Sequence, residues 1–118
     1  MANRLILIVD DEKNMRTTLA DILVGEGFDV TMAESGEKAL KLCGRQDFDM
    51  VLMDVRMPGI DGLEAFRRIR KKKSQTRVIM MSAYAVDHLE RAALAEGAVA
   101  FLRKPLDPER MLLLLADN

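Results

Sequence analysis

Short apolar runs alternate with amphipathic segments five times along this chain. The runs have the length and composition of β-strands and are Leu5–Val9, Phe28–Met32, Met50–Met53, Val78–Met81 and Ala98–Leu102. The first, third and fourth are apolar throughout, as in strands buried on both faces of a parallel sheet. The second alternates apolar and polar side chains, as a half-exposed strand does. The pattern predicts an α/β domain with a doubly wound parallel sheet of strand order 2-1-3-4-5.

The amphipathic segments carry residues that are common at helix boundaries. Gly, Ser and Asp mark their ends, and Pro108 stands at a first helical position. The expected helices are a first that ends at Gly25, a second from about Ser35 to Gly44, a third that begins at Asp61, a fourth from about Val86 to Glu96, and a fifth that begins at Asp107.

Length and composition fit one small intracellular domain. The chain has 118 residues, with 18 basic and 19 acidic side chains, so no overall charge favours nucleic acid or a membrane surface. Cys43 is the only cysteine, which excludes an intramolecular disulfide and suits a reducing cytoplasm. The longest apolar stretches are far shorter than a membrane span, and the amino end lacks the layout of a signal peptide. We expect a single cytoplasmic domain over residues 1–118, without direct binding to nucleic acid or membrane.

Two compositional clusters need separate explanations. The basic run Arg67–Lys73 contains no interleaved aromatic residue, so we interpret it as a solvated helix end with favourable charge at the negative end of the helix dipole. The run Met111–Ala116 has more successive apolar residues than one helix face can bury. An interaction surface on the outward side of Leu112–Leu115 is therefore a hypothesis, with plain core packing as the alternative.

Three carboxylates stand where apolar runs end. Asp10 and Asp11 follow the first run and Asp54 follows the third, so they converge at the carboxyl edge of the predicted sheet, where the strand order reverses. Such groups repel one another unless a cation lies among them. Oxygen ligands indicate a hard ion, Mg²⁺ or alternatively Mn²⁺. The only histidine, His88, is expected on the surface, which argues against His-ligated zinc and His-based catalytic triads.

A hydroxyl and an ammonium follow the fourth and fifth runs. Ser82 and Lys104 are thereby expected on the same rim as the carboxylates. A metal ion and Lys104 would neutralise phosphoryl oxygens, Ser82 would donate a hydrogen bond, and one carboxylate remains as a nucleophile. Taken alone, Asp10 and Asp11 are explained equally well as caps of the first helix. Asp61 and Asp107 are interpreted only as caps of later helices.

Four motifs in this order and spacing resemble the receiver domain of bacterial two-component response regulators (CheY-like) over essentially the whole chain. They are Asp10-Asp11, Asp54 with Met57–Gly62 behind it, Ser82-Ala83, and Lys104-Pro105. The resemblance implies a flavodoxin-like (βα)5 fold. It also implies that Asp54 is the phosphoacceptor and takes its phosphoryl group from a phosphohistidine of a histidine kinase or histidine phosphotransfer protein.

The same resemblance implies roles for further residues. Asp11, Asp54 and the backbone carbonyl of Arg56 would ligate Mg²⁺ directly, Asp10 would act mainly through bound water, and the Lys104-Pro105 peptide would be cis. Phe101 matches a switch aromatic that turns inward when Ser82 moves toward the phosphoryl group. The surface of the fourth helix, fifth strand and fifth helix would then change and control an output domain, a partner or a second copy of the chain.

Arg56 has a second expected role that follows from its position two residues after Asp54. Its long cationic side chain can cover a phosphoryl group and pair with its oxygens, which would hinder an attacking water and lengthen the life of the acyl phosphate. The alternative is that Arg56 points into solvent without effect.

Three classes of function remain open from the residues. We expect a switch that is operated by its own phosphorylation. Such a protein is the substrate of a kinase, takes a phosphoryl group from small phosphodonors and removes it by self-dephosphorylation, but is otherwise not an enzyme. A metal-dependent phosphohydrolase usually has Asp-x-Asp and a cap domain, whereas this chain has Asp10-Asp11 and no segment large enough for a cap. A degenerate receiver used as a scaffold is disfavoured because every acceptor-site residue is present. The residues also leave open whether the receiver acts alone or as part of a longer regulator.

Overall fold

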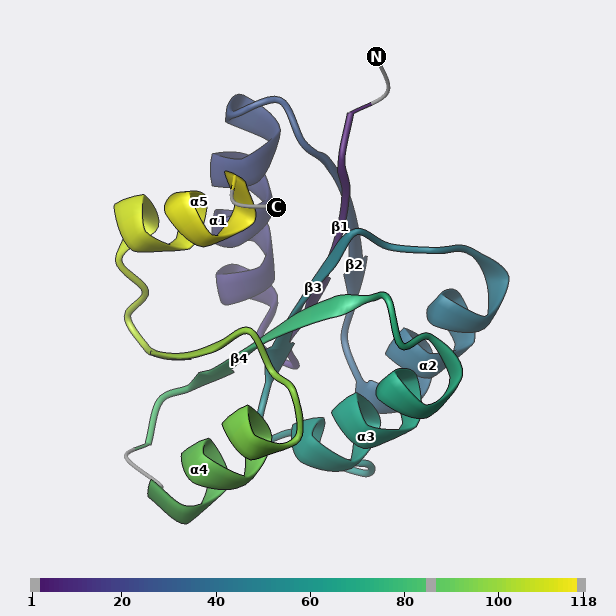
Figure 1. The fold of residues 1–118 in the computed structure, drawn as a ribbon. Coiled ribbons are helices and arrows are strands. Elements are labelled where there is room, and N and C mark those ends of the chain that lie inside the picture. Colours follow the sequence, from purple (N-terminus) through teal and green to yellow (C-terminus); the bar gives the residue numbers. More distant parts are fainter. Residues whose placement is uncertain (1–2, 85–86, 117–118) are drawn as a thin grey trace.

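The computed structural model of the chain describes residues 3–84 and 87–116. A five-stranded parallel sheet lies between two layers of helices (Figure 1). The strands are β1 (Leu5–Val9), β2 (Asp29–Ala33), β3 (Met50–Asp54), β4 (Arg77–Ser82) and β5 (Ala100–Arg103). Their order is β2-β1-β3-β4-β5, which confirms the predicted topology of the doubly wound sheet.

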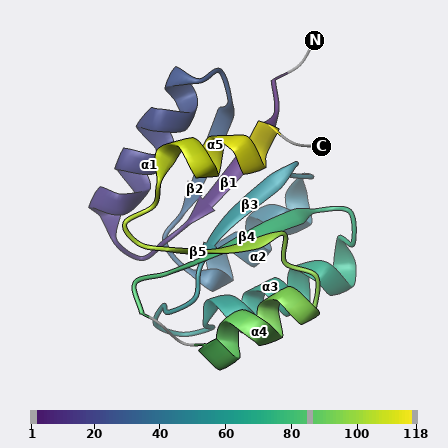
Figure 2. The same cartoon turned by 60° about the vertical axis from the view of Figure 1, so that its left-hand side comes forward.

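Among the described residues, four helices connect successive strands and a fifth follows β5, and together they cover both faces of the sheet. They are α1 (Lys13–Gly25), α2 (Gly36–Arg45), α3 (Gly62–Lys72), α4 (Asp87–Ala95) and α5 (Pro108–Ala116). Helices α1 and α5 cover one face and α2, α3 and α4 the other, as the two views in Figures 1 and 2 show. Val86, the predicted start of the fourth helix, lies outside the described residues. No helix in the described ranges is long and apolar enough to cross a bilayer.

The core divides into two clusters because alternate strand residues face opposite layers. In β1, Leu7 and Val9 face α2, α3 and α4, whereas Ile6 and Ile8 face α1 and α5. Every residue of β3 is buried, while β2 is partly exposed, as the alternation in its sequence predicted. The hydrophobic pattern therefore predicted both the strands and which of them lie at the centre of the sheet.

The fifth strand begins later than its sequence predicted. Ala98 was expected to start it, but its backbone N–H donates to the carbonyl of Ala93 and so completes the exit from α4. Pairing with β4 along the sheet begins with Val99, whose N–H donates to Val78. An apolar run does not distinguish a buried helix exit from the first residues of a strand, so the boundary was two residues too early.

Candidate functional site

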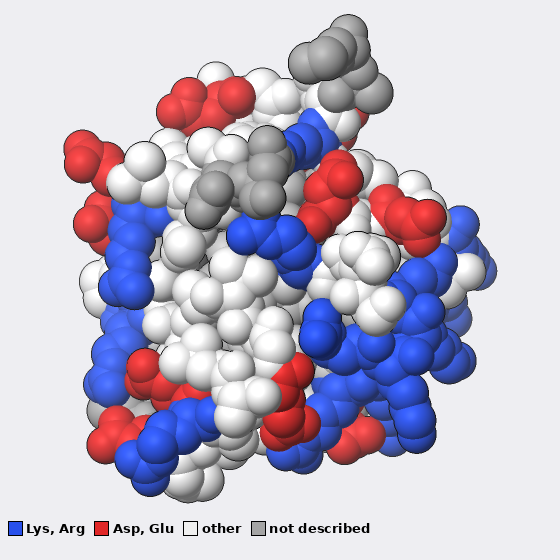
Figure 3. Space-filling view, in the orientation of Figure 1, with Lys and Arg blue, Asp and Glu red and all other residues white. Residues whose placement is uncertain are grey.

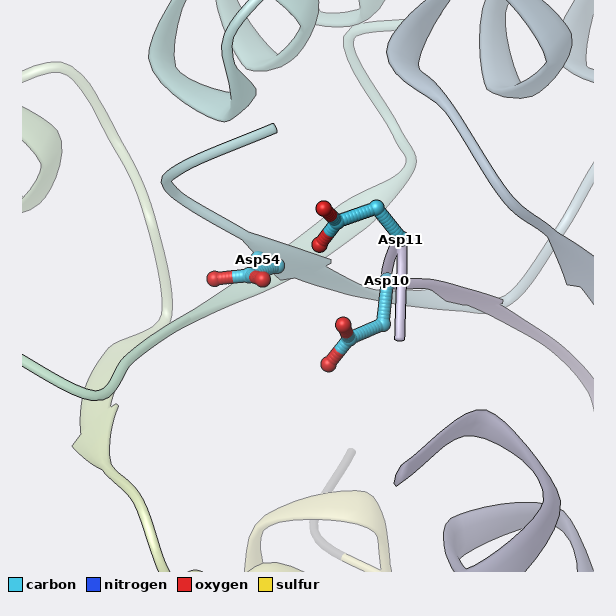
Figure 4. A group of neighbouring side chains, drawn as sticks. All are labelled: Asp10, Asp11 and Asp54. Carbon is cyan, nitrogen blue, oxygen red and sulfur yellow. The ribbon is translucent and has the colours of Figure 1, made fainter. Parts of the chain in front are cut away.

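Three carboxylates gather at the carboxyl ends of β1 and β3 (Figure 4). Asp10 and Asp11 follow β1, and Asp54 is the last residue of β3. One oxygen from each carboxylate lies within 4.8 Å of the others. Asp10 and Asp54 are buried and Asp11 is exposed, so the cluster opens to solvent on the Asp11 side. The sequence placed these residues on one edge, and the structure brings their oxygens together.

This donor set fits a hard divalent cation. Mg²⁺ binds oxygen at about 2.0–2.1 Å and is usually held by a few carboxylates and waters rather than by a complete protein cage. The three carboxylates offer only oxygen, and their close spacing allows them to share one ion. Placing negative groups so close together is unfavourable without positive charge among them. The cluster can therefore hold a metal ion.

Lys104 supplies positive charge on the buried side of the cluster, away from Asp11. Its Nζ lies 2.6 Å from Oδ2 of Asp10 and 3.2 Å from Oδ2 of Asp54. The residue is positioned just after β5, where its backbone N–H donates to the carbonyl of Ser82, and the Lys104-Pro105 peptide is cis as expected. One ammonium thus bridges the two buried carboxylates and leaves the exposed Asp11 without it.

Burial dominates the electrostatics of the site. It raises the pKa of Asp54 to about 6, and the Asp10 charge adds to this shift, whereas the Lys104 ammonium and the Arg56 backbone N–H oppose it. Burial alone would lower the pKa of Lys104, but its hydrogen bond to Asp10 and the charges of Asp54 and Asp10 outweigh that effect and raise it. Lys104 therefore stays charged while Asp54 exchanges its proton just below neutral pH.

Ser82 ends β4 and its side chain is turned toward its own loop. It is 1% exposed, and its hydroxyl donates to the Tyr84 carbonyl and accepts from the Tyr84 N–H, both at 3.0 Å. In the part of the chain that the structure describes, Ser82 makes no hydrogen bond to Asp54. The hydroxyl is thus on the predicted rim but engaged in a local turn.

Phe101 lies in β5 and is already buried, at 7% exposure, in the cluster that faces α4. The Phe101 ring is therefore already turned inward in this structure. Its role as a switch aromatic stays a prediction.

The sequence analysis missed Tyr84, which borders the site. The Arg56 guanidinium lies 5.0 Å from the centre of the Tyr84 ring, a cation–π contact that joins the loop after β3 to the loop after β4. Tyr84 is the only tyrosine of the chain and stands two residues after Ser82, which was the available signal. Arg56 is exposed and lies against the Tyr84 ring, and its effect on the life of the acyl phosphate stays a prediction.

Two other residues shape the loop behind Asp54. Glu37 of α2 accepts a hydrogen bond from the Ile60 N–H through Oε2 at 3.1 Å. A Cβ on Gly62 would lie 1.9 Å from the Asp54 carbonyl oxygen, so only glycine lets α3 begin this close to β3. The Gly62 N–H donates to Val55 at 2.7 Å. Glu37 could not be found from the sequence, because its partner Ile60 is 23 residues away along the chain.

The capping alternatives have different outcomes. Helix α1 has Glu12 at its N-cap position and no side-chain cap, so Asp10 and Asp11 do not cap it. Oδ1 of Asp10 instead accepts from the Glu12 N–H before the helix begins. Asp61 accepts from the Glu64 N–H and Asp107 from the Glu109 N–H, as their helix-start interpretation predicted.

Comparisons with known proteins agree on one family. The model of the response regulator receiver domain matches residues 6–116. Chemotaxis protein CheY of Bacillus subtilis is 41% identical over 95% of this chain and 93% of its own length. Regulatory protein AtoC of Escherichia coli is 40% identical over 93% of this chain, but the chain spans only 24% of AtoC. In the solved CheX–CheY–BeF3–Mg complex of Borrelia burgdorferi, the matched chain has a TM-score of 0.89 and 33% identity, covering 95% of this chain and 86% of that one.

Proposed function

Since this chain belongs to the response regulator receiver family, whose members are phosphoacceptors, we propose that Asp54 accepts a phosphoryl group from a phosphohistidine. The donor would be a histidine kinase or a histidine phosphotransfer protein in the cytoplasm. The observation that carries the proposal is the buried Asp54 carboxylate, which lies beside two further carboxylates and 3.2 Å from the Lys104 ammonium. Two-component signalling is thus the proposed context, with residues 1–118 as one receiver domain.

The transfer is a displacement at phosphorus. An Asp54 oxygen forms the new P–O bond while the P–N bond to the donor histidine breaks, and the departing imidazole nitrogen keeps the electron pair and takes up a proton. The attacking carboxylate must be ionised. A pKa of about 6 leaves Asp54 mostly ionised at neutral pH.

Mg²⁺, or Mn²⁺ in its place, would neutralise charge on the phosphoryl oxygens. We propose that Asp11, Asp54 and the backbone carbonyl of Arg56 ligate it directly. Asp10 would act mainly through bound water, since its Oδ2 is already hydrogen-bonded to Lys104 and its Oδ1 to the Glu12 N–H. Lys104 itself would move its hydrogen bond from Asp54 to a phosphoryl oxygen.

Ser82 would couple the acceptor to the surface. To donate to a phosphoryl oxygen, the Ser82 hydroxyl must give up the hydrogen bond that it donates to the Tyr84 carbonyl, which would loosen the turn at Tyr84. Because Phe101 is already buried and has no hydroxyl, the response proposed here is a repacking of the ring rather than its entry from solvent. The α4-β5-α5 face would then bind an output domain, a partner or a second copy.

Self-dephosphorylation closes the cycle. A water oxygen attacks phosphorus, the bond between phosphorus and the Asp54 oxygen breaks, and the products are inorganic phosphate and the free carboxylate. No other turnover is proposed.

Incubation with acetyl phosphate and Mg²⁺, followed by mass mapping, tests the acceptor. The wild type should carry one phosphoryl group at Asp54, and Asp54→Asn should take up none. Asp61→Asn is the matched control, because Asn also caps a helix and Asp61 is an exposed carboxylate of the neighbouring loop. Phosphate found mainly at Asp49 or Asp61, or rapid turnover of varied phosphate esters, would reject the proposal.

Lys104→Ala tests the coupling. The variant should still bind Mg²⁺ but lose the structural response to phosphorylation, since the ammonium links the acceptor to the end of β5. NMR chemical-shift changes around Phe101 on phosphorylation report that response. Changes of wild-type size in the variant would contradict the assigned role.

A further inference from the structure

A groove opens between the second halves of α2 and α3. Leu40 and Cys43 from α2 and Ile69 from α3 form its apolar floor, and its volume is about 230 Å³. This space is several times the roughly 30 Å³ that one water occupies. A Cβ on Gly44, which also lines the groove, would meet no atom within 4 Å. The groove thus has room for a large side chain that this chain does not itself provide.

Cations line the rim of the groove on the α3 side. Arg68 pairs with Glu64 and Lys73 with Asp47, at 2.9 and 2.6 Å. Lys71 and Lys72 also line the groove, and neither has an ion pair or side-chain hydrogen bond within residues 3–84 and 87–116. Their charges are exposed beside an apolar floor.

Helix α2 adds to this positive surface. Lys38, Lys41 and Arg45 are exposed and likewise have no ion pair within the described ranges. Figure 3 shows the resulting concentration of basic side chains at the lower right, where Figure 1 places α2 and α3. The whole chain has a net charge of −1, so this concentration is local. The helix dipole explains cations in the last turn of α3 but neither the lysines within α2 nor the apolar floor.

The groove lies near the amino ends of the strands, whereas Asp54 lies at their carboxyl ends. Helix α3 begins next to the end of β3 and ends before Arg77, which pairs with Met50 at the start of that strand. The second half of α3 therefore lies by the amino ends of the strands. The acceptor site and the groove can be occupied at the same time.

We propose that the α2–α3 groove docks an acidic, amphipathic helix of a partner protein. One apolar side chain of that helix enters the space against Leu40, Cys43 and Ile69, and carboxylates beside it pair with Lys71 and Lys72. Charge complementarity selects an acidic partner, and the apolar floor selects an amphipathic one. Nucleic acid fits less well because no aromatic side chain lines the groove for stacking bases.

Fluorescence anisotropy with a synthetic probe tests the docking. The probe is a labelled helical peptide in which Leu recurs every three or four residues with Glu between. Gly44→Leu fills the groove from within, and Gly25→Leu is the matched control, a helical glycine of α1 with equally open surroundings on the other layer. We expect Gly44→Leu to weaken binding by about tenfold or more and Gly25→Leu to leave it unchanged.

A charge variant and a second peptide keep the test independent of how Gly44→Leu folds. Lys71→Glu with Lys72→Glu should also weaken binding by about tenfold, and so should replacing the peptide's Leu by Ser. Amide shifts on binding should map to α2 and α3. Phosphorylation of Asp54 by acetyl phosphate should stay at the wild-type level in every variant, which separates this proposal from that of the acceptor.

Three results would overturn the docking proposal. One is wild-type binding by Gly44→Leu in a protein that melts normally. Another is equal binding of the Leu and Ser peptides, which would mean that charge alone attracts the probe. The third is tighter binding of a single-stranded oligonucleotide or of anionic vesicles than of the peptide, which would assign the surface to a different class of partner.

Discussion

Replacing Asp54 by Asn should stabilise the protein against unfolding above pH 6 when no divalent cation is present. Asp54 is 6% exposed, and burial is the main reason that its pKa is raised from 3.8 to about 6. The ionised carboxylate is therefore less favourable in the folded protein than in the unfolded chain. Asn has nearly the same shape without the charge, and its amide oxygen can still accept from Lys104, which lies 3.2 Å from Oδ2.

The magnitude follows from the size of the pKa shift. A rise from 3.8 to about 6 corresponds to about 3 kcal/mol, at ~1.4 kcal/mol per unit. Below the lower value both states are protonated and the carboxylate has no effect. Between the two values the unfolded chain ionises first, so the free energy of unfolding falls as pH rises. Above about pH 6 the full destabilisation is present and constant.

Urea unfolding of wild type and Asp54→Asn in EDTA, at several values from pH 4.5 to 8, measures the effect. The free energy of unfolding of Asp54→Asn should exceed that of the wild type by an amount that grows with pH and levels off near neutrality. Mg²⁺ should reduce the difference in free energy of unfolding between the two proteins, because an ion that binds the folded wild type stabilises it. Asp61→Asn, which removes an exposed carboxylate, should show no such growth. A difference independent of pH, or a wild type more stable than the variant at pH 8 in EDTA, would refute the reasoning.

Three further predictions test the surroundings of the site. Arg56→Asn should shorten the life of the acyl phosphate by up to about tenfold, or ~1.4 kcal/mol of barrier, because the Arg56 guanidinium can turn from the Tyr84 ring, 5.0 Å away, to the phosphoryl oxygens and hinder the attacking water. Equal or slower phosphate loss from the purified phosphorylated variant would contradict this. Leu113→Lys should weaken phosphorylation-enhanced dimerisation or output binding in sedimentation experiments while leaving the melting temperature nearly unchanged, because Leu113 is 72% exposed; a large loss of stability would show that it is core. Gly62→Ala should lower the free energy of unfolding by at least about 2 kcal/mol, because its Cβ would overlap the Asp54 carbonyl. Gly44→Ala, in open space within α2, should raise the free energy of unfolding by about 0.5–1 kcal/mol. Similar values for the two variants would argue against the close approach of Gly62 to Asp54.

Local features of the sequence determined most of the fold. Apolar periodicity and boundary residues predicted the ten elements, because both act within a few residues of one another. The contrast between the continuous run of β3 and the alternation of β2 predicted which strands are central. Strand ends then placed the three carboxylates, Ser82 and Lys104 on one rim, since the carboxyl ends of parallel strands share an edge.

Tertiary structure alone decided how those groups contact one another. The pKa of Asp54 depends on how much water the assembled layers exclude, which no local pattern records. The bridging of Asp10 and Asp54 by Lys104 joins groups 94 and 50 residues apart, and its distances depend on the packing of the whole sheet. Tyr84 against Arg56 and the closeness of Gly62 to Asp54 arise likewise only when separate loops are brought together. Sequence order thus determined which residues share the edge, and the packed fold decided which of them touch.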